Sequence, residues 1–212
     1  MKTLLAGLLT PLFALALIIA PGVAVAAPPT TAQDRADIAR VEEYLNSIRT
    51  MRADFLQVAP SGDTLGGLFY LRRPGRLRFE YTAPKGNFVV ADGTFIYFWD
   101  NRLKQQSQAP IGTTLANFIL RENIRLSGDV TVTDITRGPG SLQVTMALAK
   151  DPGAGQLSLA FVDNPLELRQ WSVVDPQGLT TQVSLINPRQ GMALDTNLFW
   201  FREPGSEQPR YN

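Results

Sequence analysis

The chain of 212 residues contains no cysteine and no histidine. Without cysteine no disulfide can form, so packing alone must hold the fold, and no thiol is present to accept a lipid. The two absences also exclude a Ser-His or Cys-His nucleophile pair and a soft-ligand zinc site. The sequence therefore predicts no metal site, no cofactor and no catalytic residue of these kinds.

Carboxylates are the remaining route to an enzyme. A glycosidase, for example, needs two acids that converge on one bond. The 19 acidic residues, among them Asp54, Glu80 and Asp195, are scattered over turns and strand ends with no distinguishing spacing. We therefore expect a protein that is not an enzyme. A carboxylate hydrolase is the alternative, and a purely apolar concavity would exclude it.

Long hydrophobic runs are scarce as well. One such run spans residues 4–20, after a single lysine, and small residues up to Ala26 follow it. This order is typical of a secretory signal peptide with cleavage near Ala26. The alternative, a membrane anchor, is less favoured because the run is short and contains Pro11. We expect residues 1–26 to be removed and the mature chain to be exported and soluble.

No charge of one sign dominates. The chain has 20 Lys and Arg against 19 Asp and Glu, and removal of residues 1–26 takes away one lysine, which balances the two signs over 186 residues. Nothing in this balance indicates a nucleic-acid partner. The length fits one domain, which we place at residues 27–212.

Short runs with a period of two fill most of the chain. Leu77, Phe79 and Tyr81 alternate with charged residues, as in a strand with one apolar and one solvent-exposed face. Over residues 95–99, in contrast, both faces are apolar. Turn compositions separate the runs. The predicted strands lie near 53–59, 64–72, 77–81, 87–91, 94–99, 103–107, 130–136, 142–149, 156–162, 168–175, 180–187 and 197–202. So many short strands predict one large antiparallel sheet that must curl or close.

Two segments have helical spacing instead. Thr31 and Asp34 have the spacing of a capping box. An apolar stripe then recurs at three and four residues, formed by Ile38, Val41, Leu45, Ile48 and Met51. Residues 112–121 form a second, shorter pattern of this kind. We expect these two helices to cover the concave face of the sheet.

Apolar side chains from strands and helices are expected to meet on that face. They are Leu77, Phe79, Tyr81 and Val89 from the strands, and Leu45, Ile48, Met51, Leu115 and Phe118 from the helices. Small barrels fill themselves with such side chains, whereas larger ones enclose a cavity. Periodicity alone leaves both an ordinary core and a ligand cavity open.

Several strings resemble the periplasmic lipoprotein carriers of the LolA family. They are RPGRLRFEY at 73–81, Pro84, VVADG at 89–93 and FIYFWD at 95–100, with ADFLQ at 53–57 upstream and ALD at 193–195, Leu198, Phe199 and Phe201 downstream. The resemblance covers most of the mature chain, and it is specific over residues 53–100. It implies a mainly β fold with covering helices, in which a curved sheet forms an incomplete barrel around a hydrophobic cavity under a helical lid.

The resemblance also implies a function. Members of the family hold the acyl chains of a lipoprotein and carry it across the periplasm, from an inner-membrane ABC-type release complex to an outer-membrane receptor. The family's lid arginine falls on Arg73, which would hydrogen-bond the lid helix in the empty state. Arg72, Arg76 and Arg78 compete for that role. We expect a periplasmic monomer.

Two related alternatives share this fold. The outer-membrane receptor of the same pathway is anchored through a lipidated cysteine, which this chain lacks. A general periplasmic lipid or glycolipid shuttle remains open, because a fold does not determine its cargo.

Overall fold

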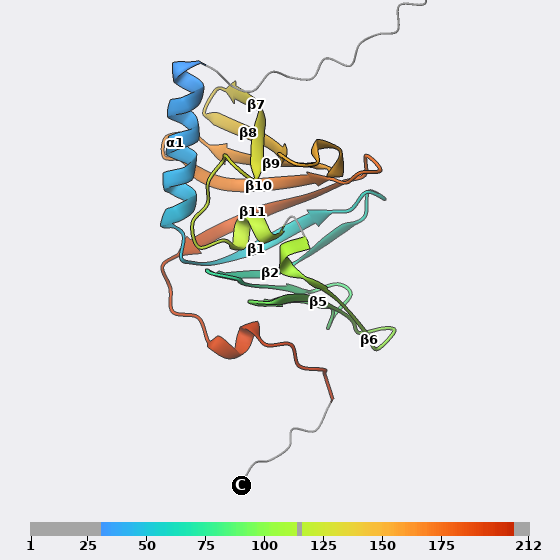
Figure 1. Cartoon of the computed structure of the whole chain (residues 1–212). Coiled ribbons are helices and arrows are strands. Elements are labelled where there is room, and N and C mark those ends of the chain that lie inside the picture. The colour runs from blue at the N-terminus through green and yellow to red at the C-terminus, as the bar shows by residue number, and fades with distance from the viewer. Residues whose placement is uncertain (1–30, 114–115, 206–212) are drawn as a thin grey trace, which may run out of the picture.

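The computed structural model describes residues 31–113 and 116–205, and its centre is one sheet of 11 strands. The strand order is β6-β5-β4-β3-β2-β1-β11-β10-β9-β8-β7, and every pairing is antiparallel. β6 and β7 form the two edges and do not pair with each other, so the sheet is curved and unclosed (Figure 1). The predicted single antiparallel sheet is confirmed. The predicted signal peptide lies outside the described residues.

The predicted strands from 53–59 to 180–187 each overlap an observed strand. The observed strands are β1 (Thr50–Val58), β2 (Thr64–Arg72), β3 (Arg76–Tyr81), β4 (Phe88–Asp92), β5 (Phe95–Asp100), β6 (Gln105–Pro110), β7 (Val130–Gly138), β8 (Ser141–Leu148), β9 (Gln156–Val162), β10 (Glu167–Val174) and β11 (Thr180–Gln190).

β6 and β7 follow each other in sequence but lie at opposite edges of the sheet. The chain between them must therefore cross the sheet. It does so on the concave side, through the 3-10 helix η1 (Ile111–Thr113) and the short helix α2 (Ala116–Leu120). Phe118, Leu120 and Ile124 of this connection are buried in the main core. The predicted second helix is thus present, and it lies over the concavity.

The first helix, α1 (Ala32–Ser47), runs across the strands (Figure 1). It begins at the predicted capping box, in which Thr31 and Asp34 each bond the other's backbone N–H. The prediction that its stripe continues to Met51 is wrong, because the helix ends at Ser47 and Ile48 is already extended. Met51 belongs to β1, where it pairs with Leu71 and Gln190. Sheet pairing on both sides overrides the local helical period.

The predicted strand at 197–202 is also wrong. Asp195 caps a 3-10 helix, η3 (Thr196–Phe199), and accepts a hydrogen bond from the backbone N–H of Asn197. After this turn the chain continues without strand pairing to the end of the described residues. The sheet offers this segment no free edge nearby, because β3 and β4 are each paired on both sides. The segment instead lies against the convex face of these strands.

Two apolar clusters pack on the two faces of the sheet. The main core fills the concave side beneath α1 and the connection between β6 and β7. A smaller cluster on the convex side joins Phe88, Val90 and Trp99 with Tyr97 and Phe201. The second cluster explains why both faces of β5 are apolar, since the C-terminal segment covers the outer one.

Candidate functional site: an apolar hollow divided by a short helix

The connection across the sheet leaves space on the concave face next to α2. We name one such space, of 160 Å³, the central chamber. It is lined by Phe69, Leu77, Phe79, Ile96, Ile119, Leu157, Trp171 and Val173. The ring centroid of Phe79 lies 4.8 Å from that of Phe69 and 6.3 Å from that of Trp171. The central chamber is therefore an apolar site with three aromatic rings and with no ionisable lining group among the described residues.

A second space, of 280 Å³, lies between α2 and the strands at the β7 edge. We name it the β7-side chamber. It is lined by Gly112, Asn117, Phe118, Arg121, Val130, Met146, Ala147, Leu148, Ala154 and Leu157. Arg121 is partly exposed and pairs with Asp129 at 3.2 Å. This chamber thus combines apolar walls from three strands with polar groups on α2 and the residue that follows it.

The structure distributes the predicted hollow residues over several environments. Leu77 and Phe79 line the central chamber, and Phe118 lines the β7-side chamber. Leu45, Ile48 and Met51 surround only 20 Å³ of space, so in this structure they are packed core beneath α1. Their predicted contact with a ligand stays a prediction.

The remaining predicted residues do not line either chamber, or they lie outside the described residues. The hydroxyl of Tyr81 donates to Gln57 Oε1 at 2.9 Å, and its ring meets Phe55 edge to face. Val89 lines a shallow depression near the β6 edge, together with Ile96 and Phe98. Leu115 lies outside the described residues.

Sequence reasoning missed most of the chamber walls: of the 17 residues that line the two chambers, it predicted three, Leu77, Phe79 and Phe118. Among the missed residues are Met146, Leu157, Trp171 and Val173 on β8, β9 and β10, Ile96 on β5 and Ile119 on α2. The alternation of Leu157, Leu159 and Phe161 with polar or small residues could have marked an inward face. No family motif was recognised there, so these side chains had no functional assignment.

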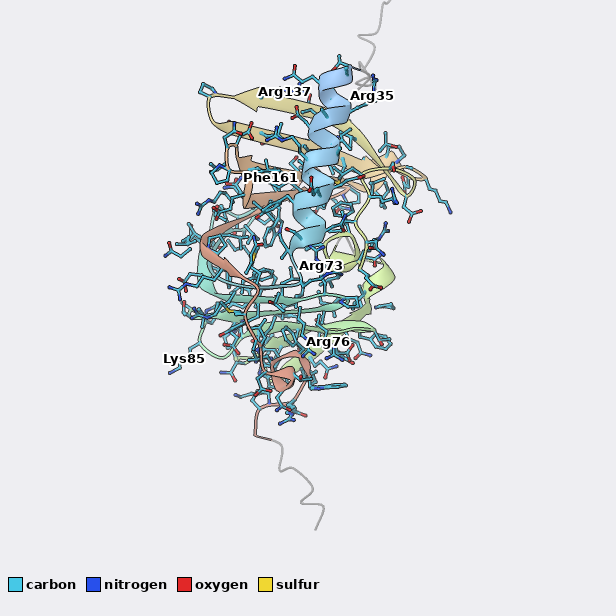
Figure 2. All side chains as sticks on the ribbon, turned by 90° about the vertical axis from the view of Figure 1, so that its left-hand side faces the viewer. Arg35, Arg73, Arg76, Lys85, Arg137 and Phe161 are labelled. Carbon is cyan, nitrogen blue, oxygen red and sulfur yellow. The ribbon has the colours of Figure 1, made fainter. Side chains whose placement is uncertain are left out.

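Arg73 is buried beneath the C-terminal end of α1 (Figure 2), with 7% of its surface exposed. It borders the packed region that contains Phe118 and Ile119 of α2. Its Nε and Nη1 have no hydrogen-bond partner among the described residues. Burial, with a contribution from nearby Arg49, lowers the pKa of Arg73 to about 10. The side chain is thus a desolvated cation inside an apolar region, an arrangement that costs free energy.

The neighbouring arginines have different surroundings. Arg72 donates to Thr196 Oγ1 at 2.8 Å, and Arg78 donates to Glu80 and to the backbone oxygen of Leu198. Arg76 lies 5.6 Å from the ring of Trp200. All three therefore engage groups on the convex side or in the C-terminal segment. Of these arginines, Arg73 is the one that borders the helices over the concave face.

Backbone and side-chain hydrogen bonds hold the connection that carries α2. The N–H of Gly75, at the corner between β2 and β3, donates to the backbone oxygen of Leu120 at 2.8 Å. Farther along, Asn46 of α1 bonds both backbone polar groups of Ile124, and Glu42 accepts from the N–H of Leu126 at 2.6 Å. α2 is therefore tied to the sheet at its C-terminal end, and the segment after it is tied to α1.

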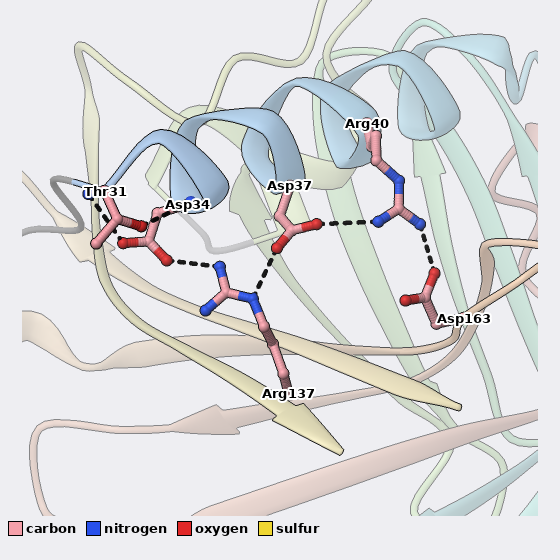
Figure 3. A network of polar contacts seen from close by, with 6 residues as sticks. All are labelled: Thr31, Asp34, Asp37, Arg40, Arg137 and Asp163. Carbon is pink, nitrogen blue, oxygen red and sulfur yellow. Dashed lines mark hydrogen bonds and ion pairs between the residues drawn. The ribbon is translucent and has the colours of Figure 1, made fainter. Parts of the chain in front are cut away.

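An ion network fixes the other end of α1 to the sheet (Figure 3). Arg137 at the end of β7 binds Asp34 at 2.5 Å and Asp37 at 2.8 Å. Asp37 also binds Arg40 at 2.9 Å, and Arg40 reaches Asp163 between β9 and β10. Hydrogen bonds from Thr31 and Arg137 lower the pKa of Asp34 below its ordinary 3.8. α1 is thus anchored at both ends, whereas α2 is a single short helix over the chambers.

A curved, unclosed antiparallel sheet with apolar chambers under covering helices defines the class of open half-barrels with an internal apolar site. The chain belongs to the LolA family, because the family model described as "Outer membrane lipoprotein carrier protein LolA" matches residues 46–202.

Individual relatives agree with this family. The chain is 30% identical over 173 residues to an outer-membrane lipoprotein carrier protein of Methylococcus capsulatus, with 78% of this chain and 83% of that protein covered. It is 27% identical over 202 residues to the protein of the same description in Chromobacterium violaceum, with 92% and 95% covered. A DUF1329 family protein from Desulfovibrio piger has a similar fold, with a TM-score of 0.50 and 9% identity over 79% of this chain and 96% of that one.

Neither α1 nor α2 has the length and hydropathy that a membrane crossing requires, and the same holds for every other helix in the described part of the chain.

Proposed function

We propose that this protein is a periplasmic carrier that binds the acyl chains of lipoproteins on its concave face and transports them to the outer membrane. The observation that carries the proposal is the pair of chambers with mainly apolar walls beside α2, of 160 and 280 Å³. An apolar cavity of about 150 Å³ takes a benzene-sized ligand, so each chamber as it stands admits part of an acyl chain, and a complete chain would require α2 to move. Each methylene transferred from water into such a site contributes about 0.8 kcal/mol, so a long chain gains affinity quickly.

A carrier must also release its cargo. The short helix α2 over the chambers, which we propose as the lid, would allow this release. α2 has five residues and is held at its C-terminal end by the bond from Gly75 to Leu120. A short helix with so few ties can lift at small cost compared with α1, which is anchored at both ends. We assign Arg73 the role of a latch, because it is the buried cation beside Phe118 and Ile119 of that helix. A desolvated guanidinium also makes the packed region less favourable to an acyl chain, which favours release.

The proposed route has two further partners. Lipoproteins would be taken from an ABC-type release complex in the inner membrane and passed to a receptor in the outer membrane. The names of the relatives, outer-membrane lipoprotein carrier proteins, support the lipoprotein cargo and the outer-membrane destination. The protein would act without a cofactor or covalent chemistry, as a monomer in the periplasm.

Copurified lipid tests the proposal directly. The full chain would be expressed with a C-terminal tag in a bacterium with two membranes, purified from the periplasm, and its bound molecules identified by mass spectrometry. We expect acylated lipoproteins with the wild type and much less with Phe79→Glu, which places a charge in the central chamber. Trp200→Glu is the control, because Trp200 is 47% exposed and lies outside both chambers.

The other outcomes separate the alternatives. Phospholipid or glycolipid without lipoprotein would favour a general lipid shuttle on the same fold. An absence of any bound lipid from the wild type would contradict the carrier proposal. A Phe79→Glu variant that loses stability as much as it loses lipid would mean that Phe79 is simply core.

A further inference from the structure

We infer that α2 divides the hollow into two separate acyl-chain sites, and that the β7-side chamber takes one chain of the cargo while the central chamber takes another. This inference rests on the proposed function and adds to it the place of individual chains. In an anchor with two or more chains, the chains would then lie on the two sides of α2.

The division follows from the two neighbouring residues at the middle of α2. Phe118 lines the β7-side chamber, and Ile119 lines the central chamber. Successive side chains of an α-helix point about 100° apart, so one helical turn presents these two groups to different spaces. Leu157 of β9 lines both chambers from below. α2 above and Leu157 below therefore form the partition.

The two chambers differ in polarity: the central chamber is wholly apolar, whereas the β7-side chamber also has polar groups. The central chamber is walled by apolar groups throughout, including three aromatic rings. The β7-side chamber has apolar walls formed by Val130, Met146 and Leu148, and it has Asn117 and Arg121 at the helix. An apolar interior with a few polar groups at one side is typical of a site that orients an amphiphile. The ester or amide groups at the head of an acyl chain are ligands for Asn117 and Arg121.

Chamber-filling variants test the partition. Leu148 and Val173 are both partly buried, and each lines one chamber and not the other. Binding of hexadecanoate to the tagged full chain would be counted by native mass spectrometry for the wild type, Leu148→Trp, Val173→Trp and the double variant. Val162→Trp is the matched control, because Val162 is 41% exposed and lines neither chamber. Thermal unfolding would confirm that each variant is folded.

We expect two hexadecanoates on the wild type and the control, one on each single variant and none on the double variant. A dipalmitoyl lipopeptide should bind each single variant on the order of 100-fold more weakly than the wild type, because one tethered chain has lost its site. One hexadecanoate on the wild type, or complete loss with either single substitution, would overturn the partition and leave the carrier proposal intact. A wild type that binds neither hexadecanoate nor lipopeptide would instead contradict the carrier proposal itself.

Discussion

Asn46 binds both backbone polar groups of Ile124. Its Nδ2 donates to the Ile124 oxygen at 2.9 Å, and its Oδ1 accepts from the Ile124 N–H at 2.8 Å. Ile124 is buried, with 1% of its surface exposed. The side chain of Asn46 on α1 thus supplies hydrogen-bond partners for both its backbone N–H and its backbone C=O. The pair fixes the segment that follows α2 to α1.

Replacement of Asn46 should loosen this segment. We expect Asn46→Ala to lower the free energy of unfolding by about 2 kcal/mol, because a partly buried N–H and C=O lose their partners. Urea unfolding measures the loss, and hydrogen exchange should show faster exchange at residues 122–126. Ser47→Ala is the control, since Ser47 is exposed and its hydroxyl bonds only the nearby Tyr44 oxygen. Unchanged exchange in Asn46→Ala would mean that other contacts hold the segment.

The ion network at the start of α1 predicts an acid-sensitive contribution to stability. Since the pKa of Asp34 is lowered on folding, the folded state binds this proton more weakly than the unfolded state. The stabilisation is complete above the unfolded-state pKa of 3.8 and is lost as the pH falls through the lower folded-state value. Asp34→Asn should therefore melt at a lower temperature than the wild type at pH 7, and this difference should shrink from pH 4 to pH 2.

Two comparisons sharpen that experiment. The gap between wild type and Asp34→Asn should also narrow in 1 M salt, where charges are screened within about 3 Å. Asp129→Asn should change the melting temperature little, because Asp129 is 69% exposed and exposed pairs contribute little. A gap that is constant from pH 7 to pH 2 would mean that Asp34 acts through packing and capping alone.

Arg73→Leu should separate loading from release. The variant should bind lipoprotein at least as well as the wild type and transfer it to the receptor more slowly, because the packed region beside α2 becomes wholly apolar. It should also gain up to about 2 kcal/mol in urea unfolding, since the variant replaces a buried cation, whose Nε and Nη1 have no hydrogen-bond partner among the described residues, by a hydrophobic group. Arg72→Leu is the control at the adjacent position, where the guanidinium bonds Thr196. Transfer by Arg73→Leu at the wild-type rate would exclude the latch role.

The C-terminal segment should stabilise the fold without affecting the chambers. Phe201 stacks on Tyr97 with ring centroids 5.0 Å apart and also contacts Phe88. We expect Phe201→Ala to cost about 2 kcal/mol in urea, somewhat less than for a fully buried phenylalanine. Trp200→Ala should cost about 1 kcal/mol or less, because that ring is half exposed and its cation–π contact with Arg76 is at the surface. Both variants should keep wild-type hexadecanoate binding.

Gly67 should tolerate no side chain. A Cβ at this position would lie 1.8 Å from the backbone oxygen of Glu80, so β2 and β3 would have to separate. We expect Gly67→Ala to cost about 3 kcal/mol or more in urea unfolding. Gly66→Ala should cost less, because its Cβ would be 3.2 Å from the nearest atom, the Phe55 oxygen. Equal losses at the two positions would show that strand flexibility, and not this close approach, sets the cost.

The sequence predicts the strands well because their information is local. The alternation of Leu77 and Phe79 with Arg78 and Glu80 survives intact in β3, where the apolar residues face the hollow. The errors occur where partners distant in sequence decide the outcome. The helical spacing that includes Met51 is overridden by pairing with Leu71 and Gln190, and neither partner can be read from the helix itself.

The site was predictable only in part, because residues distant in sequence come together to form the chamber walls. Leu77, Phe79 and Phe118 were placed in the hollow by pattern and family resemblance, and they do line the chambers. Leu157 and Trp171 complete the walls because the curvature of the sheet brings β9 and β10 close to strands of the first half, such as β2 and β3. Sequence periodicity cannot predict this curvature. The tie between Gly75 and Leu120 is invisible in the sequence, since it joins two backbone groups.

The edges of the sheet, β6 and β7, never meet. In a closed barrel the number of strands and their stagger fix the radius, so the interior volume is set by the ladder of hydrogen bonds. Here no such relation applies, and the curvature depends on what packs against the concave face. We therefore expect that the sheet can flatten or tighten around ligands of different width without loss of a strand pair.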